Sequence, residues 1–158
     1  MMQLQVSQPS RVSEKVALPP AEIIPCHPDH LSVVWPIVEP WLQNALKYGP
    51  DLYGTEDIRK LVAEQNMILW LAIDAKEIIG FCIVSVVKYP RALVGDIHWT
   101  GGAVHKGRFW LDEMFSTLKA WAIHSGCTKL GGGGRRGWIE KYGFKEHGVM
   151  FEMELNNE

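Results

Sequence analysis

Apolar and polar residues alternate with a strand period in some segments of the chain and repeat with a helical period in others. These two patterns divide the chain into short predicted strands and helices. Compact or alternating apolar runs predict β-strands, and an apolar position every three or four residues predicts an α-helix. Strands are predicted at residues 22–26, 67–73, 78–87, 93–99, 127–130 and 150–155. Helices are predicted at residues 29–47, 55–65 and 109–125, with a short helical turn before residue 142.

The segment 109–125 has the most regular helical pattern in the sequence. Its apolar stripe consists of Leu111, Met114, Phe115, Leu118, Trp121 and Ala122. Gly126 follows at a position where helices commonly end. The helical region before it is less regular, because Pro36 and Pro40 lack a backbone N–H group and are predicted to interrupt it. Thr55 is the predicted N-cap of the next helix.

The lengths of the connections predict a mixed sheet. Short turns at residues 74–76 and 89–91 join antiparallel neighbours. A helix-length connection separates strands 93–99 and 127–130, which predicts that these two strands are parallel neighbours. The last predicted strand, 150–155, alternates Met150, Glu152 and Glu154 with Phe151, Met153 and Leu155.

Residues 1–20 differ from the rest of the chain. They are polar, rich in Gln, Ser and Pro, and show neither helical nor strand period. Such a segment buries too little apolar surface to hold one conformation alone. We therefore divide the chain into an N-terminal arm, 1–20, and a single domain, 21–158. We predict that the arm lies on another surface and supports self-association or attachment to a partner.

Composition narrows the classes of partner. The formal net charge of −2 gives no reason to expect a nucleic-acid partner. No apolar run approaches the ~18 residues that span a bilayer, so no membrane partner is expected. The odd number of cysteines, 3, and the apolar setting of Cys82 favour a reduced, cytoplasmic protein. Cys26-His27 and His30 lack a second ligand pair, so no metal site is expected.

Glycines on both sides of the long helix mark a candidate anion site. Gly101-Gly102 precede the helix as a predicted turn, followed by Lys106, Gly107 and Arg108. A helix that begins after a glycine turn presents free N–H groups and a positive dipole end to an anion.

A second glycine run, 131–134, is followed by Arg135-Arg136. It could hold a phosphate in a backbone nest, or it could be a flexible connector with solvated arginines. Trp99 and Trp138 flank the two glycine segments and are candidates for a ligand or partner surface.

The order of elements and the residues between them resemble the GNAT superfamily, the Gcn5-related acyl-CoA N-acetyltransferases. The resemblance covers residues 22–155 and includes Gly126-Cys127 after the long helix and the closing Tyr142-Gly143-Phe144. A closer resemblance is to small GNAT-like proteins of tailed bacteriophages. It rests on Trp35-Pro36, Glu56-Asp57-Ile58, Leu69-Trp70, Tyr89-Pro90-Arg91, Gly101-Gly102, Trp121-Ala122, Gly126-Cys127 and Arg136-Gly137-Trp138.

This resemblance implies an α/β (α+β) fold with a mixed central sheet and helices on both faces. It also implies acetyl-CoA as the co-substrate. The implied CoA-binding residues are Trp99, Gly101, Gly102, Lys106, Gly107, Arg108, Arg136 and Trp138. The family's pyrophosphate loop has the pattern Arg/Gln-x-x-Gly-x-Gly/Ala. If Gly107 is its first glycine, Val104 and Phe109 replace the basic and the second small residue, so the loop is degenerate.

The catalytic residues implied by the resemblance also depart from the family pattern. Ile139 stands where many GNAT enzymes have the tyrosine that protonates the departing thiolate. Tyr142, which is displaced around the helix from that position, is the candidate that remains for a catalytic role. Asp96 and His98 are candidates for the general base, since residues two apart share a face of a strand. Their alternative interpretation is an exposed strand edge.

Two functions follow from these observations. The first is an acyl-CoA-dependent N-acetyltransferase, weakly active or inactive. The second is a structural or interaction component of a phage virion or of its assembly, with other virion proteins as partners. The resemblance places either protein in the cytoplasm of a bacterial host or in the virion.

Overall fold

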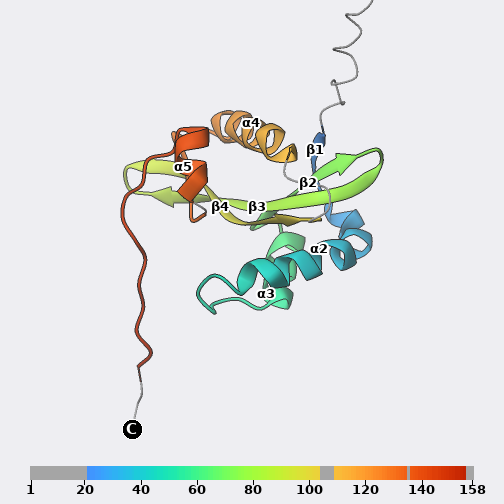
Figure 1. Ribbon diagram of the computed structural model, residues 1–158, viewed down its shortest axis with the longest axis horizontal. Helices are drawn as coiled ribbons and strands as arrows, with labels where there is room; N and C mark the ends of the chain where they lie inside the picture. Colours follow the sequence, from blue (N-terminus) through green and yellow to red (C-terminus); the bar gives the residue numbers. More distant parts are fainter. Residues whose placement is uncertain (1–20, 104–108, 135, 156–158) are drawn as a thin grey trace, which may run out of the picture.

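The computed structural model of the protein describes residues 21–103, 109–134 and 136–155 (Figure 1). The strands are β1 (Glu22–Pro25), β2 (Ile68–Asp74), β3 (Glu77–Tyr89), β4 (Ala92–Gly102) and β5 (Lys129–Gly132). The helices are the 3₁₀ turn η2 (Pro28–His30), α2 (Leu31–Leu46), α3 (Thr55–Ala63), α4 (Trp110–His124) and α5 (Arg136–Tyr142). The arm, residues 1–20, lies outside the described residues.

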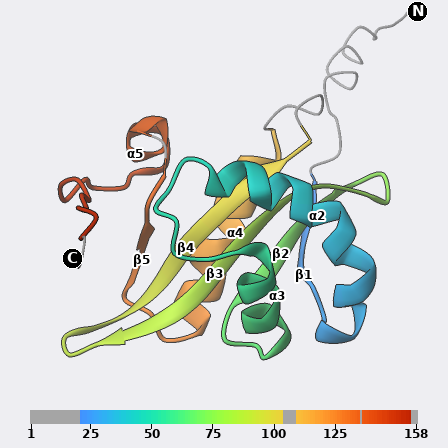
Figure 2. The ribbon, with the colours of Figure 1, turned by 90° about the horizontal axis from the view of Figure 1, so that it is seen from below.

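The five strands form one sheet in the order β1-β2-β3-β4-β5. Strands β1 to β4 pair antiparallel, whereas β4 and β5 pair parallel. Helix α4 makes the connection between β4 and β5 and lies on one face of the sheet, while α2 and α3 lie on the other (Figures 1 and 2). The predicted mixed sheet with helices on both faces is therefore confirmed.

Each face of the sheet has its own apolar core. The core under α4 contains the stripe predicted from the sequence, with Leu111, Phe115 and Leu118 packed near Ile97. The core under α2 and α3 is built around Trp35, Val38 and Leu42 of α2, which are at most 1% exposed. Two buried cores explain why the middle strands of the sheet are almost continuously apolar.

Helix α2 contradicts the predicted interruption, because it runs unbroken through Pro36 and Pro40. A proline inside a helix costs roughly 3 kcal/mol, since it removes a hydrogen bond and crowds the preceding turn. Burying a large apolar side chain contributes about 1.5–3 kcal/mol. The buried side chains of α2 therefore outweigh its two prolines.

The start of α3 also differs from the prediction. Gly54, and not Thr55, is the N-cap, and its backbone N–H donates to Asp57 Oδ2 at 2.8 Å. The Thr55 hydroxyl instead donates to Glu39 Oε2 of α2 at 2.7 Å. Thr55 thus joins two helices, a role that only their packing could reveal.

The predicted last strand, 150–155, is not formed. The segment pairs with no described strand, and Phe151 is 92% exposed. Figure 1 shows it leaving the domain as an extended chain beyond α5. The alternation of its side chains gives it a strand-like period, but a strand also needs a neighbour that supplies hydrogen bonds.

Among the described residues, no helix combines the length and the hydropathy that a membrane-spanning segment requires.

Candidate active site

The candidate site begins at an irregularity in β4. Ile83 of β3 pairs with Trp99, but the next residue, Val84, pairs with Ile97. His98 is therefore an extra residue with no partner directly opposite, which is a β-bulge. A bulge bends a strand and turns its side chains toward a new direction.

Strand β4 also parts from β5 at the bulge. The last β5 pair is Ile97 with Gly132, so the remaining residues of β4 have no described partner on that side. Gly132 has φ +147°, and a Cβ at this position would collide with the carbonyl oxygen of Ile97. Only glycine fits at this point without strain, because it tolerates both the positive φ and the close approach.

A polar cluster lies at the bulge. His98 Nε2 is 2.7 Å from the Ser85 hydroxyl oxygen and 3.9 Å from Asp96 Oδ2. Ser85 is directly opposite Asp96 across the β3–β4 pair. The structure thus brings the two predicted base candidates together and adds a hydroxyl that holds the imidazole.

Partial burial sets the protonation of this cluster. Desolvation lowers the pKa of His98 below its ordinary 6.5, although the charge of Asp96 acts in the opposite direction. Desolvation also raises the pKa of Asp96, and here His98 acts in the opposite direction. The imidazole is therefore mainly neutral at pH 7, which is the form that can accept a proton.

Two aromatic rings lie beside the cluster, on the face of the sheet that α2 and α3 cover. The rings of Trp99 and His98 are 5.2 Å apart, and Tyr53 contacts Trp99 edge-on at 5.4 Å. Tyr53 belongs to the loop before α3, and Trp99 packs against the core under α2 and α3. These rings form an apolar wall beside His98.

The glycine pair 101–102 does not form the predicted turn. Both residues lie within β4, where Gly101 pairs with Phe81 and Gly102 with Gly80. A Cβ on Gly102 would collide with the Ile79 carbonyl oxygen, and one on Gly80 with the Trp110 indole. Gly80 and Gly102 thus leave room for Trp110, which is 1% exposed, to pack against the sheet.

The predicted residues of α5 lie against α4. Phe115 contacts Trp138 at 5.1 Å and Tyr142 at 4.4 Å between ring centroids. The Tyr142 hydroxyl donates to Asp112 Oδ1 at 2.8 Å, and its pKa is raised mainly by desolvation and also by that carboxylate. These contacts bind Tyr142 to α4 and do not include Asp96 or His98.

Five candidates for contact with an anion remain, and the structure describes one of them. Arg136 forms an exposed ion pair with Glu146 at 3.1 Å. Lys106, Gly107, Arg108 and Arg135 lie outside the described residues. Their predicted contact with an anion stays a prediction.

Comparisons with known proteins find similar structures but no match at the level of sequence. No protein-family model matches the sequence, and no curated protein matches it. A predicted acetyltransferase with acetyl-CoA from Clostridium acetobutylicum matches with TM-score 0.66 and 16% identity over 85% of this chain and 96% of that one. A ribosomal-protein-alanine N-acetyltransferase from Brucella melitensis biovar Abortus 2308 matches with TM-score 0.63 and 16% identity, over 88% and 99%.

An aminoglycoside N-acetyltransferase, AAC(6')-Iy, in complex with CoA also matches, with TM-score 0.63 and 16% identity over 85% of this chain and 94% of that one. This chain has a GNAT-like fold. The GNAT-like fold that the resemblance implied is thereby confirmed.

The fold leaves backbone polar groups without a described partner at two places near the bulge-bearing strand and α4. The freed edge of β4 beyond Ile97 presents backbone groups without a β5 partner, and the first turn of α4 presents N–H groups. However, the first turn of α4 also carries Asp112 and Glu113, whose negative charge opposes a pyrophosphate. No group of three or more metal-binding side chains gathers in the described part of the chain.

Sequence reasoning missed Ser85 and Tyr53. A signal for Ser85 was present, because the tight turn that pairs Tyr89 with Ala92 also sets Ser85 opposite Asp96, four residues further along each strand. No local signal places Tyr53, since its contact with Trp99 depends on how α2 and α3 pack on the sheet.

Proposed function

We propose that the protein is an acyl-CoA-dependent N-acetyltransferase of low activity in which His98 accepts the proton of the acceptor amine. The observation that carries this proposal is the cluster of His98, Asp96 and Ser85 at the bulge where β4 leaves β5. Structural neighbours that contain acetyl-CoA or CoA support the choice of co-substrate.

Acetyl-CoA would supply the acetyl thioester: the amine nitrogen bonds to the acetyl carbon, the C–S bond breaks, and CoA leaves as a thiolate that takes a proton from water. His98, neutral at pH 7, removes the proton that the amine nitrogen loses. Asp96 stabilises the imidazolium that results, and Ser85 orients the ring. Trp99 and Tyr53 exclude water beside the amine.

Residues of α4 and α5 are the reason why we propose a low activity. Ile139 of α5 cannot donate a proton to the leaving thiolate. Tyr142 already donates its hydroxyl proton to Asp112, which holds it against α4. The carboxylates of Asp112 and Glu113 weaken the binding of an anion at the helix N-terminus.

Two measurements test the proposal. Isothermal titration with acetyl-CoA measures binding, and release of free CoA in the presence of a panel of primary amines measures transfer. The variant His98→Gln should keep acetyl-CoA binding and lose transfer by about 10²-fold or more, a usual effect of removing a general base. The control is His124→Gln, which changes an exposed histidine at the far end of α4.

The proposal fails if wild-type protein binds no acetyl-CoA, or if His98→Gln and His124→Gln transfer equally well. A wild-type rate typical of ordinary enzymes would contradict the proposed low activity. The comparison of His98→Gln with His124→Gln would still test the role of His98.

A second candidate function is an interaction module, such as a component of a phage virion that is assembled in the host cytoplasm. The observation that favours it is the exposed apolar segment after α5, where Phe151 is 92% and Met153 80% exposed. Absence of both acetyl-CoA binding and transfer would favour this role.

A further inference from the structure

We propose that the acceptor of the transfer reaction is an amine that carries a carboxylate at the far end of a short apolar chain, and that Lys129 of β5 binds this carboxylate. The compound 4-aminobutyrate is a simple member of this class. The inference rests on the proposed function and adds to it the class of acceptor and a residue that selects it.

Part of one sheet face is open beside the His98 cluster. The hairpin end of β3 and β4 extends beyond α2 and α3, which cover the rest of this face (Figure 2). The core under these helices reaches Ile83 and Trp99. Val87 and Val94 are opposite each other further along the two strands, are only partly buried, and belong to neither described core. A ligand can therefore lie on this part of the sheet.

The alternation of side chains places Asp96 and Lys129 on the open face. Gly95 and Leu130 belong to the other face, because a Cβ on Gly95 would meet the side chains of Leu130 and Trp121 under α4. Successive side chains of a strand point to opposite faces of a sheet. Asp96 follows Gly95 and Lys129 precedes Leu130, so both face away from α4.

Val94 lies between these two charged residues. It is the direct neighbour of Lys129 in the β4–β5 pair and precedes Asp96 by two positions on β4. A strand spacing of about 4.8 Å and a rise of about 3.3 Å per residue place the Cα atoms of Lys129 and Asp96 roughly 8 Å apart. An ammonium group at Asp96 and a carboxylate at Lys129 can therefore belong to one short molecule.

The charges at the two ends of this surface fit such a molecule. Asp96 attracts the ammonium group of the acceptor to the neighbourhood of His98, whose Nε2 is 3.9 Å from the Asp96 carboxylate. Lys129 is exposed and has no ion-pair partner in the described part of the chain, so its charge is available to a carboxylate. The apolar side chains of Val94 and Val87 between them can cover the methylene groups of the acceptor.

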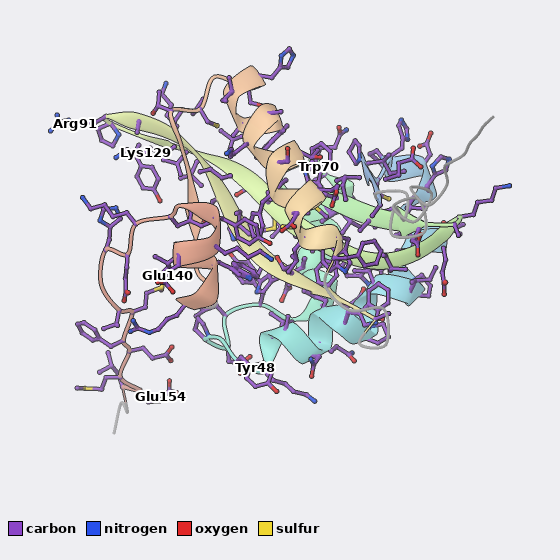
Figure 3. The ribbon with its side chains drawn as sticks, turned by 45° about the horizontal axis from the view of Figure 1, so that its top comes forward. Tyr48, Trp70, Arg91, Lys129, Glu140 and Glu154 are labelled. Carbon is purple, nitrogen blue, oxygen red and sulfur yellow. The ribbon has the colours of Figure 1, made fainter. Side chains whose placement is uncertain are left out.

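Two other basic residues at this end of the sheet are less well placed than Lys129. Arg91 is at the tip of the β3–β4 hairpin, further from the bulge, and Figure 3 shows it at the same end of the sheet as Lys129. Lys88 alternates with Val87 and therefore faces the side of α4. Lys88 thus provides a matched control for Lys129, since both are exposed lysines on neighbouring parts of the sheet but on opposite faces.

Binding is measured by isothermal titration of the full chain in the presence of CoA. The two ligands are 4-aminobutyrate and butylamine, which has the same chain length but lacks the carboxylate. We expect 4-aminobutyrate to bind about fivefold more tightly, which is the upper range for an exposed ion pair. Added salt should reduce this difference, because it screens exposed charges. Backbone NMR signals of residues 94–98 and 129 should shift when 4-aminobutyrate binds.

Variants of Lys129 test its role in both binding and transfer. Lys129→Met keeps a long side chain without the charge and should abolish the preference for 4-aminobutyrate over butylamine, in Kd and in KM. Lys129→Glu should favour the diamine putrescine, whose second ammonium group would pair with the introduced carboxylate. Lys88→Met should keep the wild-type preference. Circular dichroism confirms that each variant is folded.

The outcomes separate this inference from the proposed function. Binding of 4-aminobutyrate that depends on Lys129, without acetyl transfer, would overturn the transfer reaction and support the site at Lys129. Equal KM values for the two amines, or a preference that survives Lys129→Met, would overturn the role of Lys129 while transfer stands. Absence of both binding and transfer would overturn both.

Discussion

Two opposing effects determine the pKa of His98 and therefore whether its imidazole is neutral or charged. Burial disfavours its charged form, whereas the carboxylate of Asp96 favours it, and burial has the larger effect. A histidine whose pKa lies below its ordinary value stays neutral at physiological pH and is ready to accept a proton. In the reaction that we propose, the carboxylate of Asp96 would stabilise the imidazole of His98 once it is charged.

The first prediction concerns the pH dependence of His98. Its NMR titration should have a midpoint below 6.5 in the folded protein. Asp96→Asn should move that midpoint further down, because the carboxylate is the group that raises it. Comparison with His98→Gln assigns the signal, and a midpoint above 6.5 would contradict the burial of the ring.

The same shift has a consequence for stability. Because the unfolded chain binds the proton of His98 more readily than the folded chain does, acid favours unfolding. The contribution of His98 to stability is present above pH 6.5 and is lost as the pH falls through the lowered folded pKa.

At the scale of elements, β4 and β5 are hydrogen-bonded to each other along only part of β4. They are paired from Val94 to Ile97 of β4, and they part at the bulge. Gly132 is the last residue of β5 in the pairing, and a Cβ at this position would collide with the Ile97 carbonyl oxygen. The point where the two strands part is therefore occupied by a residue that only glycine fits without strain.

The second prediction tests that glycine. Gly132→Ala should destabilise the protein by about 1–3 kcal/mol, because alanine at a positive φ is strained and its Cβ meets Ile97. Gly131→Ala is the matched control in the same strand, since a Cβ there meets nothing within 4 Å. Urea unfolding measures both variants, and equal stability of the two would contradict the predicted strain at Gly132.

At the scale of the whole molecule, two segments at opposite ends of the chain are candidates for association. Residues 149–155 expose apolar side chains, among them Phe151 and Met153. The arm, residues 1–20, has the polar, proline-containing composition of a segment that needs another surface to become ordered. The two segments can be removed separately.

The third prediction therefore concerns deletion of residues 1–20. The remaining chain should keep its fold, with a melting temperature changed by only a few degrees, because the two cores lie within residues 21–155. Self-association or attachment to a partner should weaken. Light scattering of the truncated and full chains decides this, and an unchanged association state with no partner lost would contradict a role for the arm.

The sequence by itself determined those features that depend on neighbouring residues. The period of residues 110–124 produces helix α4, and the tight turns after β2 and β3 make their neighbours antiparallel. Asp96 and His98 share a polar cluster because they are close together on one strand. In each case, the interaction that forms the structure is local and its signal is contained in a short window.

Only the tertiary structure decided features that depend on distant partners. Burial against the sheet keeps α2 helical through Pro36 and Pro40, and packing of α2 and α3 brings Tyr53 to Trp99. The bulge at His98 arises from the register between two strands. Residues 150–155 have the pattern of a strand but no strand beside them in this chain, because a pattern supplies side chains while a strand also requires the hydrogen-bonding groups of a neighbour.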